Sequence, residues 1–403
     1  MNRAALLVTL FLMAVGPAFA DIVVTRDSVR NFVNVRVSAD GGSESVGQLR
    51  PGETLPYVRS VSGWHVVGLP GGTEGFVSKR WTEILPEPVD LSQQIVVHFL
   101  DVGTGDSTII DMGDREIIID GGDSIAVLNR YAKRVGLIQD PIELVIVTHG
   151  DTDHWKGLTR LVGFDGTEDN PFTVTEYWDP GYDRDCNSAT QGGRVNYLKF
   201  VEDMQQAVSP ALFRRPLADT HPPVTTSSSP QAVTISSLPG VEITVLHSDS
   251  NPTEGSCSSK INNASIVVMI EINGFRFLFT GDANGKERDE ASPGTPGHVE
   301  AKLLALEAVH PGLLKADVLK VPHHGSETAS TQQFVNTVDP AFAIISASTK
   351  HHLPRSTVVD RYEDGQRVIL RTDVARENDT DHILCVISST SELDCNFADV
   401  FQQ

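Results

Sequence analysis

The chain has 403 residues, of which 40% are hydrophobic, and it carries a formal net charge of −21. Its length exceeds one average domain and fits two. Because such an acidic surface repels polyanions at long range, a nucleic acid is possible as a partner but not favoured: a long strand would need a locally basic groove that composition does not reveal.

The first twenty residues have the features of a secretory signal peptide. Arg3 gives a positive start, an apolar run covers residues 4–16, and Ala18-Phe19-Ala20 forms a small-residue cleavage site. The run is shorter than the roughly 20 residues that a membrane-spanning helix needs. We therefore expect residues 1–20 to be cleaved, the mature chain to begin at Asp21 without a transmembrane segment, and the protein to be exported, periplasmic or extracellular.

Short alternating segments broken by turn residues occupy residues 21–86 and predict a small all-β barrel. They are Asn34-Val35-Arg36, Gly47-Gln48-Leu49, Pro51-Gly52, Gly63-Trp64-His65-Val66 and Gly75-Phe76-Val77. In this order they resemble the bacterial Src-homology-3 (SH3) domain. The resemblance implies a cell-wall peptide or another ligand, and the alternative is a spacer barrel whose Trp64 belongs to the core. Pro86-Glu87-Pro88 predicts a linker.

Residues 93–403 alternate strands with helices and predict an α/β domain. Strand patterns cover 95–100, 107–112, 116–119, 144–147, 241–246, 265–272, 275–279, 318–321 and 342–345, and helix patterns cover 125–135, 195–207 and 299–309. Further helix and strand pairs continue through 358–364. Residues 165–221 look irregular apart from the helix over 195–207. Two packed sheets with helices outside suit this order.

The strongest chemical signal is the segment Thr148-His149-Gly150-Asp151-Thr152-Asp153-His154, directly after a predicted buried strand. Four potential metal ligands fall within six residues of one loop. Such crowding of carboxylates and imidazoles is costly unless cations neutralise it. The same mixture of ligands suits zinc, manganese or iron, so the segment predicts a metal site.

This segment resembles the metal-binding signature of the metallo-β-lactamase superfamily, and three further blocks follow the family's order. They are Ile117-Ile118-Ile119-Asp120-Gly121-Gly122, Phe277-Leu278-Phe279-Thr280-Gly281-Asp282 and Val321-Pro322-His323-His324-Gly325-Ser326. Asp151 at the second-histidine place, the His-His-Gly-Ser block, Phe99-Leu100-Asp101-Val102-Gly103-Thr104-Gly105-Asp106-Ser107 and Arg371-Thr372-Asp373 resemble the ComEC-type branch. The resemblance implies an αββα sandwich behind the N-terminal barrel.

The resemblance also implies a site with two divalent metal ions, zinc or manganese. The implied metal ligands are His149, Asp151, Asp153, His154, Asp282, and either His323 or His324. Asp282 would bridge the metals. The first metal lacks the family's usual histidine, for which His247, Asn262 and Asn263 are candidates, although His247 fits equally well as an ordinary strand-end residue.

Other residues near these blocks have predicted supporting roles. Asp153 would orient the attacking hydroxide, and whichever of His323 and His324 is not a ligand would contact a phosphate or protonate the leaving group. Asp120 would fix the metal-binding loop. Asp101 and Asp106 would orient a ligand histidine or cap turns. Lys320 and Arg355 would supply positive charge or lie at the surface. His352 would be an ordinary surface or core histidine, or would reach the pocket rim.

The resulting prediction is an exported, two-metal hydrolase, and the resemblance to the ComEC-type branch implies that its substrate is a phosphodiester. A nucleic acid, a wall polymer and a lipid headgroup are all open as small or polymeric substrates. One alternative is a lactone or β-lactam hydrolase that uses the same metals. Another is a non-catalytic wall-binding protein with a structural metal site, which fits less well because structural sites are usually closed by four ligands.

Four cysteines, Cys186, Cys257, Cys385 and Cys395, lack the close spacing of a zinc site. Export makes disulfides possible. Of the three possible pairings we predict Cys385–Cys395, across a C-terminal hairpin, with Cys186–Cys257.

Overall fold

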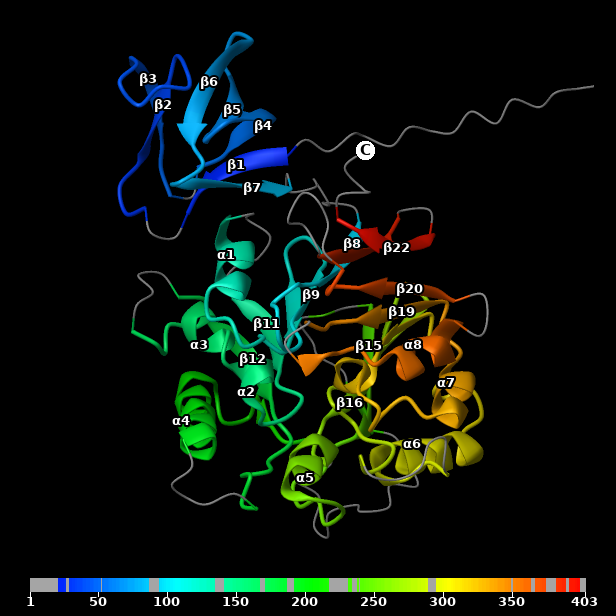
Figure 1. Cartoon of the computed structure of the whole chain (residues 1–403). Helices are drawn as coiled ribbons and strands as arrows, with labels where there is room; N and C mark the ends of the chain where they lie inside the picture. Colours follow the sequence, from blue (N-terminus) through cyan, green and yellow to red (C-terminus); the bar gives the residue numbers. More distant parts are fainter. Residues whose placement is uncertain are drawn as a thin grey trace, which may run out of the picture. The chain divides into compact units, whose positions relative to one another are not determined.

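The computed structural model describes residues 21–26, 29–51, 53–86, 94–134, 141–166, 171–186, 192–216, 231–233, 238, 240–288, 295–348, 351–363, 367–374, 382–388 and 391–398. The predicted signal peptide over 1–20 lies outside these residues. The described chain forms two compact units, one containing strands β1 to β7 and the other β8 to β22 (Figure 1). In the described part of the chain, no helix has both the length and the apolar character needed to cross a bilayer.

The N-terminal unit is a seven-stranded antiparallel sheet in the order β3-β2-β6-β5-β4-β1-β7. Its strands are β1 (Asp21–Thr25), β2 (Val33–Arg36), β3 (Ser45–Leu49), β4 (Leu55–Val61), β5 (Trp64–Leu69), β6 (Thr73–Ser78) and β7 (Thr82–Pro86). Successive side chains alternate between the two faces of a strand, so Val33 and Val35 of β2 enter the core together. The prediction of an all-β N-terminal unit is confirmed.

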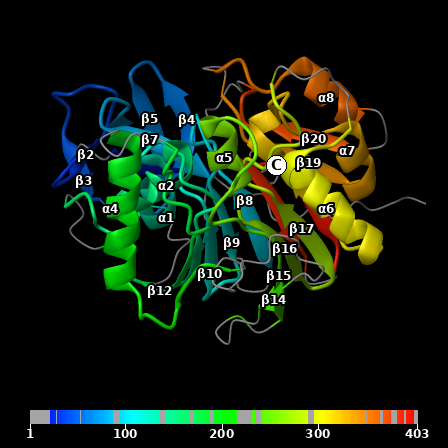
Figure 2. The ribbon, with the colours of Figure 1, turned by 90° about the horizontal axis from the view of Figure 1, so that it is seen from below.

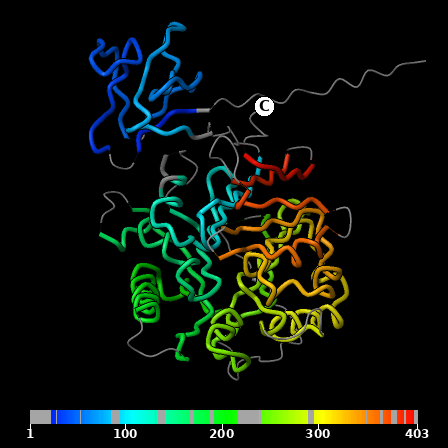
Figure 3. Tube along the Cα trace, viewed as in Figure 1, coloured from blue at the N-terminus to red at the C-terminus, as the bar shows by residue number. Residues whose placement is uncertain are grey.

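The second unit contains an eight-stranded and a seven-stranded sheet. The first has the order β13 (Phe213–Arg214), β12 (Val174–Trp178), β11 (Ile142–Ile146), β10 (Glu116–Ile119), β9 (Thr108–Asp111), β8 (Ile95–Phe99), β21 (Ile383–Ile387) and β22 (Leu393–Phe397). The second has the order β14 (Gln231–Val233), β15 (Val241–His247), β16 (Val267–Ile272), β17 (Phe275–Phe279), β18 (Val318–Lys320), β19 (Phe342–Ile345) and β20 (Val368–Arg371). Figure 3 shows how the C-terminal strands return beside β8.

The main core lies between these two sheets. Val268 and Ile270 of β16 belong to a cluster that also contains Val97 and Phe99 of β8. The Phe99 ring stacks on the Phe279 ring of β17, with 6.1 Å between the centroids. Alternation along the strands therefore joins the two sheets face to face.

Helices cover both outer faces, as Figure 2 shows. On the first sheet lie α1 (Val127–Arg134), α2 (Thr152–Trp155), α3 (Leu158–Leu161) and α4 (Gly192–Ala207); on the second lie α6 (His298–Val309), α7 (Gln332–Val338) and α8 (Ser356–Glu363). A second apolar cluster joins Val267 and Met269 of β16 to Leu303 of α6 and Phe334 of α7. The predicted αββα sandwich is confirmed.

Two strands, β12 and β13, lie within residues 165–221, where the sequence predicts irregular structure apart from one helix. β12 pairs in parallel with β11, yet Glu176 at its centre interrupts the apolar pattern of the strand. That carboxylate is buried and accepts a hydrogen bond from Trp178 Nε1 at 2.6 Å, while Arg214 Nε lies 2.7 Å away. The residue that neutralises Glu176, Arg214, lies 38 residues further along the chain, so the local sequence pattern did not predict the strand.

Both predicted disulfides are present in the structure, Cys186–Cys257 and Cys385–Cys395. The second joins paired residues of β21 and β22. The first joins the loop after β12 to α5 (Cys257–Asn263). Two disulfides are consistent with an extracytoplasmic location.

Candidate metal centre

The predicted blocks meet because each follows a strand that ends at the same edge of the sandwich. β10 and β11 run parallel in one sheet, and β17 and β18 run parallel in the other. The carboxyl ends of parallel strands lie at one edge, so Asp120, the Thr148–His154 loop, Asp282 and the turn over 322–325 lie together.

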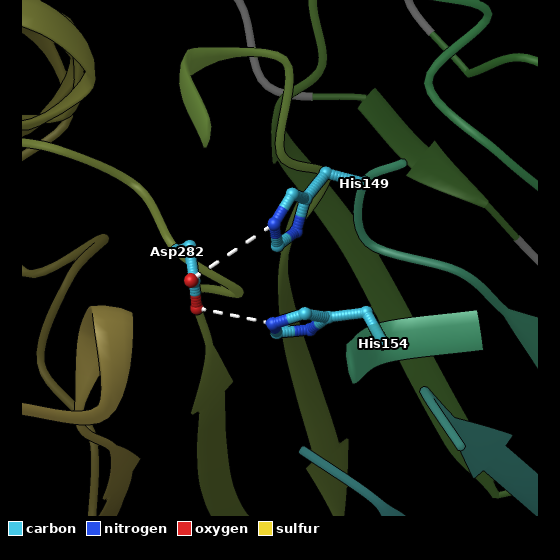
Figure 4. Close-up of side chains that lie close together, drawn as sticks. All are labelled: His149, His154 and Asp282. Carbon is cyan, nitrogen blue, oxygen red and sulfur yellow. Dashed lines mark ion pairs between the residues drawn. The ribbon is translucent and has the colours of Figure 1, made fainter. Parts of the chain in front are cut away.

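Three histidines direct one ring nitrogen toward this meeting point. The Nε2 atoms of His149, His154 and His324 are buried without a hydrogen-bond partner among the described residues. His149 Nε2 lies 3.9 Å from Asp282 Oδ2, and His154 Nε2 lies 3.4 Å from Asp282 Oδ1 (Figure 4). Buried polar atoms normally have a hydrogen-bond partner. The partner of these three nitrogen atoms must therefore come from outside the described residues.

The opposite nitrogen of each ring is held by the protein. His154 Nδ1 lies 2.8 Å from Asp120 Oδ2, and His324 Nδ1 lies 3.0 Å from the Ser346 carbonyl oxygen. His149 Nδ1 lies 3.2 Å from Thr148 Oγ1. These acceptors place the proton on Nδ1 and leave the Nε2 lone pair free, which is how metal-binding imidazoles are oriented.

His324, not His323, joins the groups that have metal-binding spacing. One group contains Asp153, His154 and His324; others contain His149, His154 and Asp282, or Asp106, Asp282 and His324. Both His323 and His324 have a positive φ, 51° and 53°, a backbone strain that non-glycine residues adopt where the surroundings enforce it.

His323 faces a different set of neighbours. Its Nδ1 lies 2.8 Å from Thr328 Oγ1 and 3.1 Å from Asn284 Oδ1. Asn262 Nδ2 lies 3.3 Å from His323 Nε2, which itself is 3.7 Å from Asp282 Oδ2. Burial lowers the pKa of His323 to about 4. Its neutral ring therefore lies beside the cluster as a hydrogen-bonding group.

His247 is not brought to this cluster. Its Nδ1 lies 2.9 Å from the Ser265 carbonyl oxygen, and no metal-spaced group among the described residues includes it. Asn262 is better placed, because it lines the same pocket as Asp151 and its buried Oδ1 has no hydrogen-bond partner in the described structure. Asn263 Nδ2 donates to the Glu254 carbonyl oxygen at 3.2 Å.

Asp120 connects the metal-binding loop to β10. Thr148 N–H donates to its Oδ1 at 2.7 Å, and Thr148 Oγ1 donates to its Oδ2 at 2.7 Å. Its Oδ2 also accepts from His154 Nδ1, as described above. Asp120 adopts a φ of 60° to reach these groups. This geometry matches the predicted role of Asp120 in fixing the loop.

Lys320 differs from its predicted role as a source of charge for substrate. It is only 3% exposed, and its ammonium contacts Asp106. Asp106 Oδ1 also lies 3.1 Å from His324 Nδ1. The Lys320 charge is thus used inside the protein, where with His324 it holds the pKa of Asp106 at about 2 although burial alone would raise it.

The carboxylates of the cluster favour positive charge on the side chains around them. Burial opposes the charged form of His324, but Asp282 and Asp106 outweigh it and raise the pKa to about 10. Burial likewise opposes charge on His154, yet Asp282 and Asp120 raise its pKa well above the ordinary value. The pKa of Asp282 is held well below its ordinary value, despite burial, by His324, His154 and His323. Protons or metal ions satisfy this demand.

A pocket of about 250 Å³ opens onto the cluster. Asp151, Asp153, Asp282, His323 and His324 line it, and so do Arg288, Arg355 and His351. Its hydroxyl-bearing lining residues are Thr104, Ser258, Ser326 and Ser348. Of the two readings of His352, the surface position agrees with the structure: His352 is exposed and is not among the lining residues of this pocket, whereas the neighbouring His351 is.

Gly105 allows the opening loop to approach the cluster. A Cβ atom there would lie 1.8 Å from the Asp153 carbonyl oxygen, and the residue has a φ of 103°. Only glycine fits this close approach. Asp106 N–H then donates to that carbonyl at 3.2 Å, which ties the loop after β8 to Asp153.

Comparison with known protein families agrees with both units. Residues 31–83 match the bacterial SH3 domain, and residues 100–228 match the metallo-β-lactamase superfamily. ComE operon protein 3 of Bacillus subtilis (strain 168) is 32% identical over 114 residues, and competence protein ComA of Neisseria gonorrhoeae is 28% identical over 116. Each match covers 28% of this chain, but only 13% and 15% of those relatives.

Two solved structures align with this chain at low sequence identity. The metallo-β-lactamase fold protein YhfI from Bacillus subtilis has 13% sequence identity and a TM-score of 0.38, covering 70% of this chain and 98% of that one. CmlA, a diiron β-hydroxylase from Streptomyces venezuelae, has 11% identity and a TM-score of 0.38, covering 72% and 53%.

The family matches, read with the fold, give the domain composition. The chain contains a bacterial SH3 domain, matched over residues 31–83, and a metallo-β-lactamase domain, matched over residues 100–228, with distant similarity to ComE operon protein 3 and competence protein ComA.

Proposed function

We propose that the metallo-β-lactamase domain is a two-metal hydrolase of phosphodiesters. The observation that carries the proposal is the convergence of three unpartnered Nε2 atoms, from His149, His154 and His324, on the Asp282 carboxylate. Imidazole and carboxylate donors of this kind fit zinc or manganese. The metal identity stays open.

The distances between side chains support two ligand sets. His154, Asp153 and His324 would hold one metal, and His149 with Asp151 would hold the other, with Asp282 between them. Asn262 is the favoured additional ligand of the second of these, in place of His247. Two bound cations would lower the pKa of a shared water and stabilise charge on phosphoryl oxygens.

The pocket lining favours a phosphodiester over a lactone or β-lactam. Arg288 and Arg355 would bind the non-bridging oxygens, because guanidinium groups match phosphate geometry. His323 would donate or accept a hydrogen bond beside the leaving oxygen. Ala347 and Leu353 are the aliphatic residues of the described lining, which offers little surface to an uncharged apolar substrate.

A site that opens into a pocket also argues against a purely structural metal. Asp153 and His324 belong to a metal-spaced group and line the pocket at the same time. Structural metal sites are usually closed by protein ligands. The disulfides and the predicted signal peptide support action outside the cytoplasm.

The test is hydrolysis of bis-(p-nitrophenyl) phosphate by the metal-stripped full chain, reloaded separately with zinc and manganese. We expect turnover that depends on metal and is lost in the Asp153→Ala, His154→Ala double variant. The control variant Asp114→Ala, His310→Ala changes the same residue types outside the cluster and should retain activity. Metal binding without phosphodiester turnover would overturn the proposal, and a parallel lactone assay would show whether that alternative replaces it.

A further inference from the structure

The SH3 domain contains a second, larger pocket of about 600 Å³. Its lining includes three arginines and three aromatic residues: Arg30, Arg36, Arg80, Phe32, Trp64 and Trp81. None of the lining residues is acidic. The pocket therefore combines positive charge with flat apolar rings.

The three arginines keep their charge free for an external anion, although Arg36 Nη1 also donates a hydrogen bond to the Ser43 carbonyl oxygen. Within the described residues, none of them forms an ion pair with a carboxylate. By contrast, Arg59 contacts Glu74, and Arg26 lies 4.0 Å from Glu83. Glu74 and Glu83 thus lie beside arginines outside the pocket, and in the described part of the domain no carboxylate pairs with the pocket arginines.

The aromatic side chains are exposed where a ligand would meet them. Phe32 is 43% exposed and Trp81 is 41% exposed. The Arg80 guanidinium lies 4.8 Å from the centre of the Trp81 ring, so charge and ring surface are adjacent. Exposed rings beside guanidinium groups offer flat surfaces on which a planar, negatively charged ligand can stack.

Charge is also distributed unevenly between the domains. Residues 21–86 carry seven basic and seven acidic side chains and have no net charge, whereas residues 87–403 carry −22. A polyanion is therefore repelled by the larger domain and least opposed at the SH3 domain. This is the local basic surface that the overall composition conceals.

We infer that this pocket binds single-stranded nucleic acid, with phosphates on Arg30, Arg36 and Arg80 and bases stacked on Phe32 and Trp81. Arginines that follow a backbone and aromatic rings that stack bases are the features by which proteins hold single strands. A wall polyphosphate would use the arginines but leave the rings without a partner. A role in presenting substrate rests on the proposed phosphodiesterase function, whereas the binding itself does not.

The test is fluorescence anisotropy of a labelled oligothymidine with the full chain in EDTA, where metal-dependent cleavage cannot contribute. We expect the logarithm of the association constant to fall with the logarithm of the salt concentration. The slope should be about −2, because three arginines each contact one phosphate and each such contact on a single strand contributes about 0.7. Arg80→Gln should reduce this slope by about 0.7. Arg59→Gln, which removes the same charge outside the pocket, should leave it unchanged.

Stacking is tested separately from charge. Trp81→Ala and Phe32→Ala should each weaken oligothymidine binding by about fivefold or more, as expected for loss of one stacked base. Val58→Ala removes an exposed apolar side chain outside the pocket and should have no effect. An abasic oligomer that binds as tightly as oligothymidine, or a wall peptide that binds while oligothymidine does not, would overturn the inference. Turnover of the small phosphodiester does not need this pocket, so failure here leaves the proposed function standing.

Discussion

Asp120 connects Thr148 and His154 through one carboxylate, so its substitution separates orientation of a ligand from ligation itself. In Asp120→Asn, the amide group offers a donor where His154 Nδ1 and Thr148 Oγ1 both need an acceptor. We expect zinc affinity to fall about 10- to 100-fold, the range for loss of such supporting contacts. Competition with a fluorescent zinc chelator measures it.

The control is Asp114→Asn, because Asp114 has a largely exposed side chain outside the cluster. Circular dichroism should show both variants folded. If Asp120→Asn bound zinc as tightly as the unchanged chain, the orientation of His154 would not depend on Asp120.

Lys320 and Asp106 form a buried ion pair between the two sheets' strand ends, which makes Lys320 a stability residue. Lys320→Met leaves the Asp106 carboxylate buried without its main cation. Removing one partner of a buried ion pair typically costs about 3–5 kcal/mol, and His324, whose Nδ1 lies 3.1 Å from Asp106, would offset part of this cost. We expect the urea midpoint of Lys320→Met to fall, and the second substitution Asp106→Asn to restore part of it. Equal stability of Lys320→Met and the unchanged chain would contradict this account.

At the residue scale, the sequence predicted the loop that binds metal but not how every side chain is used. His149, Asp151, Asp153 and His154 lie on one short loop, so their proximity follows from local spacing. The choice of His324 over His323 depends on two positive φ angles after β18, which the spacing does not encode. The pairing of Lys320 with Asp106 spans 214 residues and depends on how the sheets pack.

At the element scale, the Cys186–Cys257 disulfide joins two segments that contribute to the site. Arg184, two residues before Cys186, donates to the Gly150 carbonyl oxygen at 2.7 Å and lies 3.1 Å from Asp151 Oδ1. On the other side, α5 begins at Cys257 and carries Ser258 and Asn262 to the pocket. The disulfide therefore links the metal-binding loop to the opposite wall of the pocket.

Removal of this disulfide should affect both stability and activity. In Cys186→Ser, Cys257→Ser, a crosslink across 71 residues is lost, for which chain entropy alone gives about 4 kcal/mol. We also expect a higher KM for bis-(p-nitrophenyl) phosphate, because Ser258 and Asn262 lose their anchor. Urea unfolding and steady-state kinetics under the same metal loading measure the two effects.

The second disulfide supplies a matched control. Cys385→Ser, Cys395→Ser opens a crosslink across only 10 residues on β21 and β22, and it should lower stability less while leaving KM unchanged. If both double variants changed KM equally, or neither did, the link between α5 and the metal-binding loop would have no functional role.

The elements themselves were largely predictable, and the exceptions have a physical cause. β10 and β17 coincide with their predicted ranges because each ends in three consecutive apolar residues, Ile117–Ile119 and Phe277–Phe279, that run directly into a turn. β12 was missed because Glu176 breaks its apolar run, and the neutralising Arg214 lies on β13. Helix α5 carries no long apolar stripe, and its start follows from Ser256, whose side chain caps it.

At the scale of the whole molecule, buried neutral histidines outside the metal centre make stability depend on pH. Burial, with a contribution from His382, lowers the pKa of His98 to about 3, and burial lowers the pKa of His382 to about 4. His382 must be neutral at Nδ1, because that atom accepts a hydrogen bond from Asp101 N–H at 2.8 Å. Both residues lie in the larger unit, on or beside strands of its first sheet.

The sign of the effect follows from proton binding. A histidine in the unfolded chain has a pKa of about 6.5. Below that pH the unfolded chain binds protons at these positions, whereas in the native chain His98 and His382 stay neutral down to about pH 3–4. Stability present above pH 6.5 is therefore lost as the pH falls toward 4, by about 1.4 kcal/mol per pH unit for each such histidine. Urea midpoints at pH 7.5, 6.5, 5.5 and 4.5, on metal-stripped protein, measure this slope.

His382→Asn keeps an acceptor for Asp101 N–H but cannot be protonated, so its slope should be shallower by about one histidine's share. The control His352→Asn, at an exposed position, should leave the slope unchanged. A slope that His382→Asn does not alter would mean that His382 is not kept neutral by its burial in the native chain.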